Sequence, residues 1–327
     1  MGEFDLIERY FKSAAKPSAH VALGIGDDCA LLAPAPGMQL AISSDMLVEG
    51  RHFLSTVNPE ALGHKALAVN LSDLAACGAK PVAFTLALSM PRVDEAWLEG
   101  FSRGLFALAD AHGCALIGGD TTAGPLNICI TVFGHVPIGQ ALLRSGARAG
   151  DDIYVSGLPG QARLALEAFR GHISLPESDF ALTRERMERP TPRVALGLAL
   201  RGIASSAIDV SDGLLGDLGH ILKASNMGAE IDLNAIYLIA NNVDNIRASS
   251  QFSLNFLRQM VLAGGDDYEL VFTAAAAQRE AVQSAAQLSH TRITRIGSVH
   301  AEAGLILREA NGQTAPNDLT SFDHFKS

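Results

Sequence analysis

Strand-like apolar runs alternate with helical runs in the N-terminal half, and this order constrains the fold more than any other feature of the chain. The strand-like runs are rich in β-forming residues or continuously apolar, as is typical of strands in a covered sheet. The sequence therefore predicts a mixed α/β (α+β) fold. The predicted strands cover residues 38–43, 82–90, 114–119 and 126–136.

Two helices are predicted between these strands. The first has Asn58 as its N-cap and Pro59 at its first position, and it ends near Gly78. The second begins at Asp94, repeats apolar residues at helical spacing and ends at Gly113.

The polar, glycine-bearing segment 144–152 is the best candidate for a domain boundary. We therefore expect an N-terminal domain of residues 1–143 and a C-terminal α/β domain of residues 144–327. Residues 237–253 have weak periodicity and are predicted to be a loop or an insertion. The second domain is expected to use the runs 153–157, 162–169, 207–225, 268–272, 294–299 and 304–309.

Composition excludes several functional classes. Of the 327 residues 48% are hydrophobic, and the net charge is −10, so we expect no nucleic-acid partner, because phosphate backbones attract clustered Lys and Arg. No apolar run approaches the roughly 20 residues that span a bilayer, so no membrane association is expected. The first residues are acidic where a signal peptide would be basic, and the four cysteines show no C-x-x-C spacing. Both observations predict a cytoplasmic protein.

Aspartates gather in six short clusters, most of which are predicted to lie at strand ends or helix starts. A single cluster is more often a turn or an N-cap than a site. Six in one chain favour a shared site, because the neighbouring apolar runs would bring them together. The clusters are GIGDDC (24–29), SSD (43–45), NLSD (70–73), GGDTT (118–122), DVSD (209–212) and GGDDYE (264–269).

Carboxylates that converge need cations among them. Two unit charges 4 Å apart repel by about 4 kcal/mol at an effective dielectric near 20. Oxygen ligands favour Mg²⁺, Mn²⁺ or Ca²⁺, whereas the sparse cysteines and histidines argue against zinc. A metal held in this way would also let Asp27 and Asp28 tolerate a phosphate.

Three further features fit a phosphate and metal site. Asn70 and Asp73 are three residues apart on the first predicted helix and so share a face, although Asn70 could equally bond a loop carbonyl. Residues 118–125, GGDTTAGP, offer backbone N–H groups to phosphate oxygens, and Arg144 offers a bidentate contact. The chain has no G-x-x-x-x-G-K-[ST], H-R-D or G-x-S-x-G motif, so nucleotide handling would depend on metal bridging.

Eight ordered motifs resemble the bacterial thiamine-monophosphate kinase family over nearly the whole chain. They are GIGDDCALL, AISSDMLVEGRHF, KALAVNLSDLAACGAKP, IGGDTTAGP, RSGARAGD, SSAIDVSDGLLGDLGHI, GGDDYEL and SFDHF. The resemblance implies a two-domain α/β protomer that dimerises through its N-terminal sheets and holds ATP and several Mg²⁺ ions in a cleft. It further implies transfer of phosphate from ATP to thiamine monophosphate by direct in-line attack, with the N-terminal domain binding ATP and metal and the C-terminal domain completing the cleft.

The family's roles map onto this sequence residue by residue. Metal-ligand positions are Asp28, Ser43, Ser44, Asp45, Asp73, Asp120, Asp209 and Asp212. Positions near ATP are Gly119, Asp120, Arg144 and Ser211, and positions near the thiamine moiety are His52, Asp266 and Phe322. The catalytic role is assigned to Asp45, Asp73, Asp120 and Asp212.

Departures from the family pattern affect the substrate positions. Asp266 stands where the family usually has Glu, and Phe322 stands where it often has Trp. Asp27 is expected to shape its turn, and the segment 237–253 is longer than expected.

Two alternative functions stay open. One is another ATP-using enzyme of the same superfamily, although residues 45–53, DMLVEGRHF, differ from the D-G-V-G-T-K of the cyclo-ligase. The other is a metal and nucleotide-binding protein without turnover.

Overall fold

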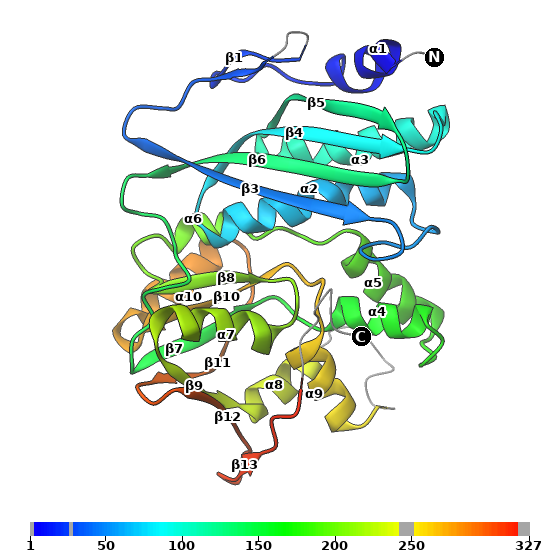
Figure 1. The fold of residues 1–327 in the computed structure, drawn as a ribbon. Coiled ribbons are helices and arrows are strands. Elements are labelled where there is room, and N and C mark those ends of the chain that lie inside the picture. The colour runs from blue at the N-terminus through cyan, green and yellow to red at the C-terminus, as the bar shows by residue number, and fades with distance from the viewer. Residues whose placement is uncertain (1–2, 26–28, 242–251, 320–327) are drawn as a thin grey trace. The chain divides into compact units, whose positions relative to one another are not determined.

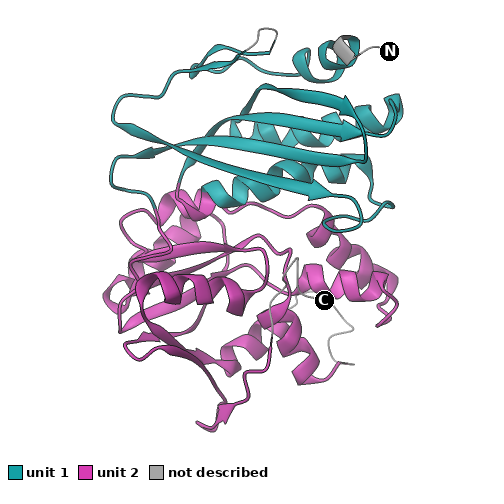
Figure 2. Cartoon of the chain, in the orientation of Figure 1, with its two compact units in different colours: residues 1–74, 79–141 teal, residues 75–78, 142–327 magenta. Residues whose placement is uncertain are grey.

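The computed structural model describes residues 3–25, 29–241 and 252–319, which form two compact units. The first unit comprises residues 1–74 and 79–141, and the second comprises residues 75–78 and 142–327 (Figure 2). The mixed α/β fold predicted from the sequence is confirmed. None of the described helices is long and apolar enough to cross a membrane.

The first unit is built on a four-stranded sheet of order β3-β6-β4-β5, with helices α2 and α3 on one face (Figure 1). Antiparallel pairing joins β3 to β6 and β6 to β4, while β4 and β5 are parallel. The elements of this unit are α1 Glu3–Leu6, the π-helix η1 Ile7–Lys12, β1 Val21–Leu23, β2 Leu31–Leu32, β3 Met38–Val48, α2 Pro59–Ala76, β4 Lys80–Met90, α3 Glu95–His112, β5 Ala115–Ala123 and β6 Asn127–Pro137.

Strand periodicity leaves one face of this sheet partly open. Ile128, Ile130 and Val132 of β6 are buried, whereas the residues between them are only partly buried. Successive side chains of a strand point to opposite faces, so these three define the covered face. The small β1-β2 sheet packs Val21 and Leu32 near Val82, Ala83 and Ile117, beside the four-stranded sheet.

The second unit contains a seven-stranded sheet of order β13-β12-β9-β11-β7-β10-β8. Its elements are β7 Asp151–Ser156, α4 Gln161–Phe169, α5 Glu177–Glu188, α6 Val194–Ala199, β8 Ser206–Val210, α7 Leu214–Ser225, β9 Gly228–Asp232, α8 Leu233–Asn241, α9 Leu254–Ala263, β10 Glu269–Ala275, the 3-10 helix η3 Ala276–Gln278, α10 Arg279–Leu288, β11 Ile293–His300, β12 Gly304–Arg308 and β13 Thr314–Ala315.

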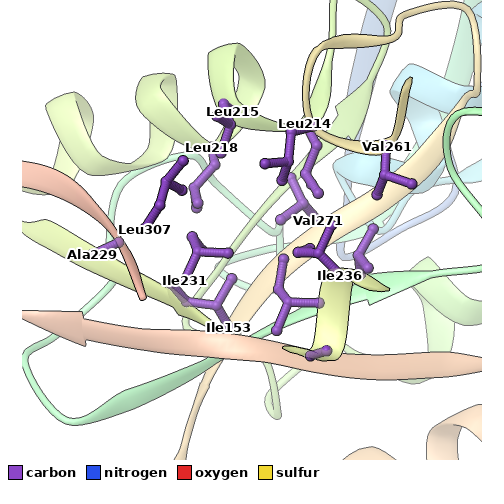
Figure 3. Close-up of a cluster of buried hydrophobic side chains, with 14 of the residues drawn as sticks. Ile153, Leu214, Leu215, Leu218, Ala229, Ile231, Ile236, Val261, Val271 and Leu307 are labelled. Atoms are coloured by element: carbon purple, nitrogen blue, oxygen red, sulfur yellow. The ribbon is translucent and has the colours of Figure 1, made fainter. Parts of the chain in front are cut away.

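The core of the second unit lies between its sheet and helices α7, α8 and α9. Leu214 and Leu218 of α7 meet Ile153 of β7 and Val271 of β10 in this cluster (Figure 3). Tyr154 and Phe272 point to the other face, as strand alternation requires, and stack 5.2 Å apart. This packing holds β8, which carries Asp209, and it holds α7 and β10, which follow the turn of Ser211 and Asp212 and the loop of Asp266.

Most predicted elements are confirmed, but the predicted loop or insertion at 237–253 does not begin at residue 237. Residues 237–241 continue α8, and Ser253 is the N-cap of α9, where its Oγ accepts the N–H of Phe256 at 3.2 Å. Residues 242–251 lie outside the described part of the chain.

Candidate active site

Strand β3 and helix α2 bring together several of the predicted ligands in the first unit. The hydroxyl of Ser43 donates to Oδ2 of Asp73, and the backbone N–H of Asp45 donates to Oδ1 of Asn70 at 3.0 Å. Asn70 is buried, and its Nδ2 donates to the carbonyl of Ala66, one turn back in α2, at 3.0 Å. The helical spacing of Asn70 and Asp73 therefore lets both residues contact β3. Asn70 holds the strand, and Asp73 contacts a neighbouring ligand candidate.

The three consecutive candidates on β3 do not share one face. Ser43 and Asp45 stand opposite the buried residues Val132 and Ile130 of β6, so both point toward the helix-covered face. Ser44 points to the open face, where its hydroxyl lies 2.9 Å from that of Thr131. Alternation along the strand therefore separates Ser44 from its two neighbours.

Asp120 lies on β5, the strand at the opposite edge of the same sheet from β3. Three strand spacings separate β5 from β3, which is roughly 14 Å at about 4.8 Å per strand. Asp120 lines a hollow of about 320 Å³ on the open face, with Met46, Cys129 and Thr122 among its other lining residues. The structure thus does not bring Asp120 to Asp45 and Asp73 within this unit.

Gly119, next to Asp120, lies at a position that only glycine can occupy. Its φ is +143°, and a Cβ would stand 1.8 Å from the carbonyl oxygen of Leu86 on β4. The close approach of β5 to β4 therefore fixes the position of Asp120.

His52 lies just beyond the end of β3. Its Nδ1 accepts the backbone N–H of Val48 at 2.9 Å, and its carbonyl accepts Nζ of Lys65 at 3.2 Å. Because Nδ1 is an acceptor, neutral His52 carries its proton on Nε2.

In the second unit the predicted ligands lie at the end of β8 and in the turn after it. Asp209 is buried in that strand opposite Leu270 of β10, and Ser211 and Asp212 lie in the turn before α7. The backbone N–H groups of Ser211, Asp212 and Gly213 donate to Oδ2 of Asp217 at 3.0, 3.1 and 3.1 Å.

Asp217 is almost fully buried in the first turns of α7. Burial raises the pKa of its carboxyl to about 6, and the charge of Asp212 adds to this effect. The three backbone N–H groups oppose the rise because they stabilise the ionised form.

Asp266 lies in the loop before β10 and contacts the Ser211 turn directly. Its backbone N–H donates to the carbonyl of Ser211 at 2.8 Å, and its φ is +71°. The next carboxylate, Asp267, accepts the N–H of Gly160 at 2.8 Å. Burial raises the pKa of Asp267 well above its usual range. The loop is therefore anchored at the predicted substrate residue and at the residue that follows it.

Arg144 is exposed and far from Ser211. Its carbonyl accepts the hydroxyl of Ser225 at 3.3 Å, at the C-terminal end of α7, whereas Ser211 precedes the N-terminal end. A helix of 12 residues is about 18 Å long. The structure therefore does not bring the backbones of these two predicted ATP contacts together.

Two predicted site residues, Asp28 and Phe322, lie outside the described part of the chain, and so does Asp27, which was expected to shape its turn. Among the residues that the structure describes, no group of three or more His, Cys, Asp or Glu side chains is close enough to hold a metal ion. Ser43 and Asp73, which share a hydrogen bond, and Asp45, on the same face of β3 as Ser43, offer oxygens of the kind that Mg²⁺ accepts. The residues present therefore fit a hard divalent cation.

One expectation about these clusters was wrong: Ser43–Asp45 and Gly118–Thr122 do not lie at strand ends, because β3 and β5 continue past the predicted ends at residues 43 and 119. Asn70 and Asp73 lie on the first helix, α2, as predicted. Because β5 is an edge strand that pairs only with β4 among the described strands, strand pairing satisfies about every second backbone N–H group that a glycine-rich loop would have offered to phosphate. The residues 118–122 thus contribute to the sheet.

Sequence reasoning also missed Asp217 and Asp267. Asp217 is buried and accepts backbone N–H groups from the turn before its helix, whereas Asp267 is partly buried and accepts the N–H of the distant Gly160. For Asp217 the sequence did hold a clue, because it interrupts the apolar face that Leu214 and Leu218 form on α7.

Comparison with known proteins identifies the family. Residues 26–136 match the model of the AIR synthase related protein N-terminal domain, and residues 139–309 match that of the C-terminal domain. A thiamine-monophosphate kinase of Salmonella typhimurium is 45% identical over 328 residues, covering 99% of this chain and 98% of the relative. The chain belongs to the thiamine-monophosphate kinase family.

Solved structures support the same family. The thiamine-monophosphate kinase of Stenotrophomonas maltophilia K279a is 44% identical with a TM-score of 0.84, covering 96% of this chain and 98% of that one. A structure described as AaThiL complexed with AMPPCP and TMP is 27% identical with a TM-score of 0.74, covering 99% of this chain and 97% of that one. The resemblance seen in the sequence motifs is therefore confirmed.

Proposed function

We propose that the protein transfers the γ-phosphate of ATP to thiamine monophosphate, which yields thiamine diphosphate and ADP. The observation that carries this proposal is the 45% identity to a thiamine-monophosphate kinase over almost the full length of both chains. A related protein has been solved with AMPPCP, a nonhydrolysable analogue of ATP, together with TMP.

Ser43, Asp45 and Asp73 are proposed to hold Mg²⁺ in the first unit. The hydrogen bond between Ser43 and Asp73 keeps two of these oxygens together, and Asn70 fixes the backbone of Asp45. Bound Mg²⁺ would neutralise the charge on the reacting phosphates. The further proposed ligands are Asp28, Ser44, Asp120, Asp209 and Asp212.

Gly119, Asp120, Arg144 and Ser211 are proposed to bind ATP. Gly119 lets β5 approach β4 closely, and Asp120 lies beside a hollow that also has hydroxyl and amide groups in its lining. Arg144 is exposed and offers a planar guanidinium to phosphate oxygens.

His52, Asp266 and Phe322 are proposed to bind the thiamine moiety. The cationic heterocycle would be attracted by the carboxylate of Asp266, whose backbone is held by the Ser211 turn. His52 offers an Nε2–H donor, because its Nδ1 accepts the N–H of Val48.

The transfer is proposed to be direct and in line. The chain's residues act by positioning the two substrates and stabilising charge, which suffices for phosphoryl transfer. Ser43 donates its hydroxyl to Asp73, but both residues are proposed metal ligands, so neither is proposed as a nucleophile. Inversion at a chiral γ-phosphate is the expected stereochemical result.

A homodimer through the first unit is also proposed, and with it a cytoplasmic enzyme without nucleic-acid or membrane partners. Support for the dimer comes from the open face of the sheet, where Ile42 and Met46 are 59% and 53% exposed. Apolar residues gathered on one exposed face favour an interface between copies. In this arrangement residues 1–143 bind ATP and metal and dimerise, and residues 144–327 complete the site.

An assay with purified protein, Mg-ATP and thiamine monophosphate tests the activity. The expected result is stoichiometric ADP and thiamine diphosphate, with no ADP when thiamine monophosphate is omitted. Binding of Mg-AMPPCP without any ADP formation would instead indicate a nucleotide-binding protein. ADP formed only with another acceptor would indicate a different enzyme of the superfamily.

A further inference from the structure

The turn between β8 and α7 directs three consecutive backbone N–H groups at one atom. Ser211, Asp212 and Gly213 each donate to Oδ2 of Asp217, at 3.0 to 3.1 Å. Successive N–H groups that converge in this way form a concavity that binds an anion, as in phosphate-binding loops. Here the anion is a carboxylate of the chain itself.

This arrangement fixes which groups of the turn can meet a ligand. The N–H groups point to Asp217 inside the unit, and the carbonyl of Ser211 accepts the N–H of Asp266 at 2.8 Å. Ser211 and Asp212 are only partly buried, so their side-chain oxygens are accessible to a ligand. The turn therefore presents acceptors, which suit a cation.

We propose that Asp217 is a positioning residue that turns the N–H groups of residues 211–213 inward and so holds Ser211 and Asp212 as oxygen donors for the Mg-nucleotide. This inference rests on the proposed function. Asp217 itself touches neither nucleotide nor metal, because its side chain is 3% exposed.

Burial makes this support hard to replace. Asp217 lies among the fully buried Leu214 and Leu218, and the turn's Gly213 is buried as well. Without the acceptor at position 217, buried N–H groups lose their partner, which favours rearrangement of the turn. A shift of 1 Å at a reacting centre can cost about 100-fold in rate.

Three variants distinguish the effect of the position of the acceptor oxygen at residue 217 from the effect of its charge. Asp217→Asn keeps an oxygen acceptor at the same place but removes the charge, whereas Asp217→Glu keeps the charge but moves the oxygen by one methylene. Asp217→Ala removes the acceptor. The matched control is Asp151→Ala, because Asp151 is equally buried and its Oδ2 accepts the N–H of Arg148 at 2.9 Å and the hydroxyl of Ser205 at 2.6 Å, away from the turn.

Each variant is measured in three ways: kcat/KM for thiamine monophosphate, affinity for Mg-AMPPCP by calorimetry, and thermal unfolding. We expect Asp217→Asn to stay within about threefold of the wild type in both activity and affinity. Asp217→Glu and Asp217→Ala should lose about 10- to 100-fold in kcat/KM and bind Mg-AMPPCP at least several-fold more weakly. Asp151→Ala should lower the unfolding temperature while leaving kcat/KM per folded molecule unchanged.

Other outcomes overturn the inference. Retention of activity by Asp217→Glu with loss by Asp217→Asn would show that charge matters and position does not. Wild-type kinetics and affinity in all three variants, or an equal loss in Asp151→Ala, would show a merely structural role. If Asp217→Ala does not fold, the comparison of Asp217→Asn with Asp217→Glu still tests the positioning role.

Calorimetry measures the affinity for Mg-AMPPCP without phosphate transfer, so it tests the positioning role independently of the proposed function. The wild type and the variants could bind Mg-AMPPCP in the predicted order of affinity while the wild type does not phosphorylate thiamine monophosphate. In that case the proposed function fails and the positioning role stands. If the wild type does not bind Mg-AMPPCP, the positioning role fails too.

Discussion

The backbone N–H of Asp266 donates a 2.8 Å hydrogen bond to the carbonyl oxygen of Ser211. This bond joins the turn with the proposed nucleotide contact to the loop with the proposed substrate contact. Asp266 forms it at a φ of +71°, a conformation that costs a non-glycine residue of order 1 kcal/mol or more. Tyr268, two residues on, is also left-handed, and its N–H donates to the carbonyl of Val210 at 2.9 Å. The loop thus holds backbone strain at a proposed substrate position.

Gly265 gives the first prediction, because it lets this loop approach the Ser211 turn. A Cβ at Gly265 would stand 2.4 Å from the carbonyl oxygen of Ser211, so Gly265→Ala must displace the Asp266 contact. We expect kcat/KM for thiamine monophosphate to fall at least tenfold.

Gly219→Ala is the matched control, since Gly219 lies in α7 and a Cβ at this position would have open space for 4 Å around it. This change should leave activity unaltered and raise the free energy of unfolding by about 0.5–1 kcal/mol. Steady-state kinetics and denaturant unfolding measure both effects. Equal kinetics in the two variants would contradict a role for the loop contact.

The β3 and α2 cluster gives the second prediction. Asp45→Asn and Asp73→Asn each replace a proposed metal ligand by a neutral isostere, so turnover should fall about 100-fold or more while the fold persists. Asn at position 73 can still accept the Ser43 hydroxyl, which preserves the local structure. ADP release at several Mg²⁺ concentrations measures turnover, and thermal unfolding shows whether the fold persists.

Asp110→Asn serves as the control for these two variants. Asp110 is in the same unit and pairs with Lys16 on the surface at 2.6 Å, where a single ion pair contributes little. Its activity should match the wild type. Near wild-type turnover of Asp45→Asn at limiting Mg²⁺ would refute the ligand role.

Local signals predicted the helices and strands well because their causes are local. Asp94 caps α3 by accepting the N–H of Trp97 at 3.1 Å, and Gly113 ends it with a φ of +60°. An Asp side chain readily accepts a backbone N–H at the start of a helix, and Gly readily adopts a positive φ at its end. The predicted strands 82–90 and 126–136 likewise became the inner strands β4 and β6, and 38–43 and 114–119 became parts of the edge strands β3 and β5.

The arrangement of the site was harder to predict, because it depends on strand order and on contacts between distant segments. The sequence places Ser43 to Asp45 and Asp120 in similar clusters, but the strand order separates β3 from β5. The role of Asp217 follows from where α7 packs. No periodicity carries that information.

Asp152 gives a prediction on pH and stability. Hydrogen bonds from Arg279, at 2.6 and 2.9 Å, and from Arg295, at 3.0 Å, lower the pKa of its buried carboxyl. A lowered carboxyl pKa stabilises the fold at pH values above the unfolded pKa of about 3.9. This stabilisation is lost as the pH falls through the lower, folded value.

Arg279→Gln should therefore destabilise the protein at neutral pH, and the difference from the wild type should shrink in acid below about pH 4. Denaturant unfolding at a series of pH values measures this. Arg186→Gln is a control, because Arg186 lies on α5 away from Asp152. A difference that stays constant down to the lowest pH at which both proteins fold would argue against the ion pair as its source.

The open sheet face gives a prediction on assembly. Ile42→Glu places a charge at an exposed apolar position of β3, so it should shift the proposed homodimer toward monomer in sedimentation experiments. Leu288→Glu is the matched control, since Leu288 is 79% exposed on α10 in the other unit. A dimer that survives Ile42→Glu and dissociates with Leu288→Glu would place the interface elsewhere.

The last prediction concerns the acceptor. Thiamine monophosphate should be a far better acceptor than thiamine, because its phosphate oxygens can join the metal shell that the aspartates hold. Thiamine brings only a hydroxyl, which would lie about one phosphate short of the in-line position, and a misplacement of even 1 Å can cost about 100-fold. The proposed contacts of His52, Asp266 and Phe322 would still bind the heterocycle, so thiamine should act as a competitive inhibitor. Comparison of kcat/KM for both acceptors at saturating Mg-ATP measures the effect, and comparable values would mean that the aspartates do not serve the acceptor phosphate.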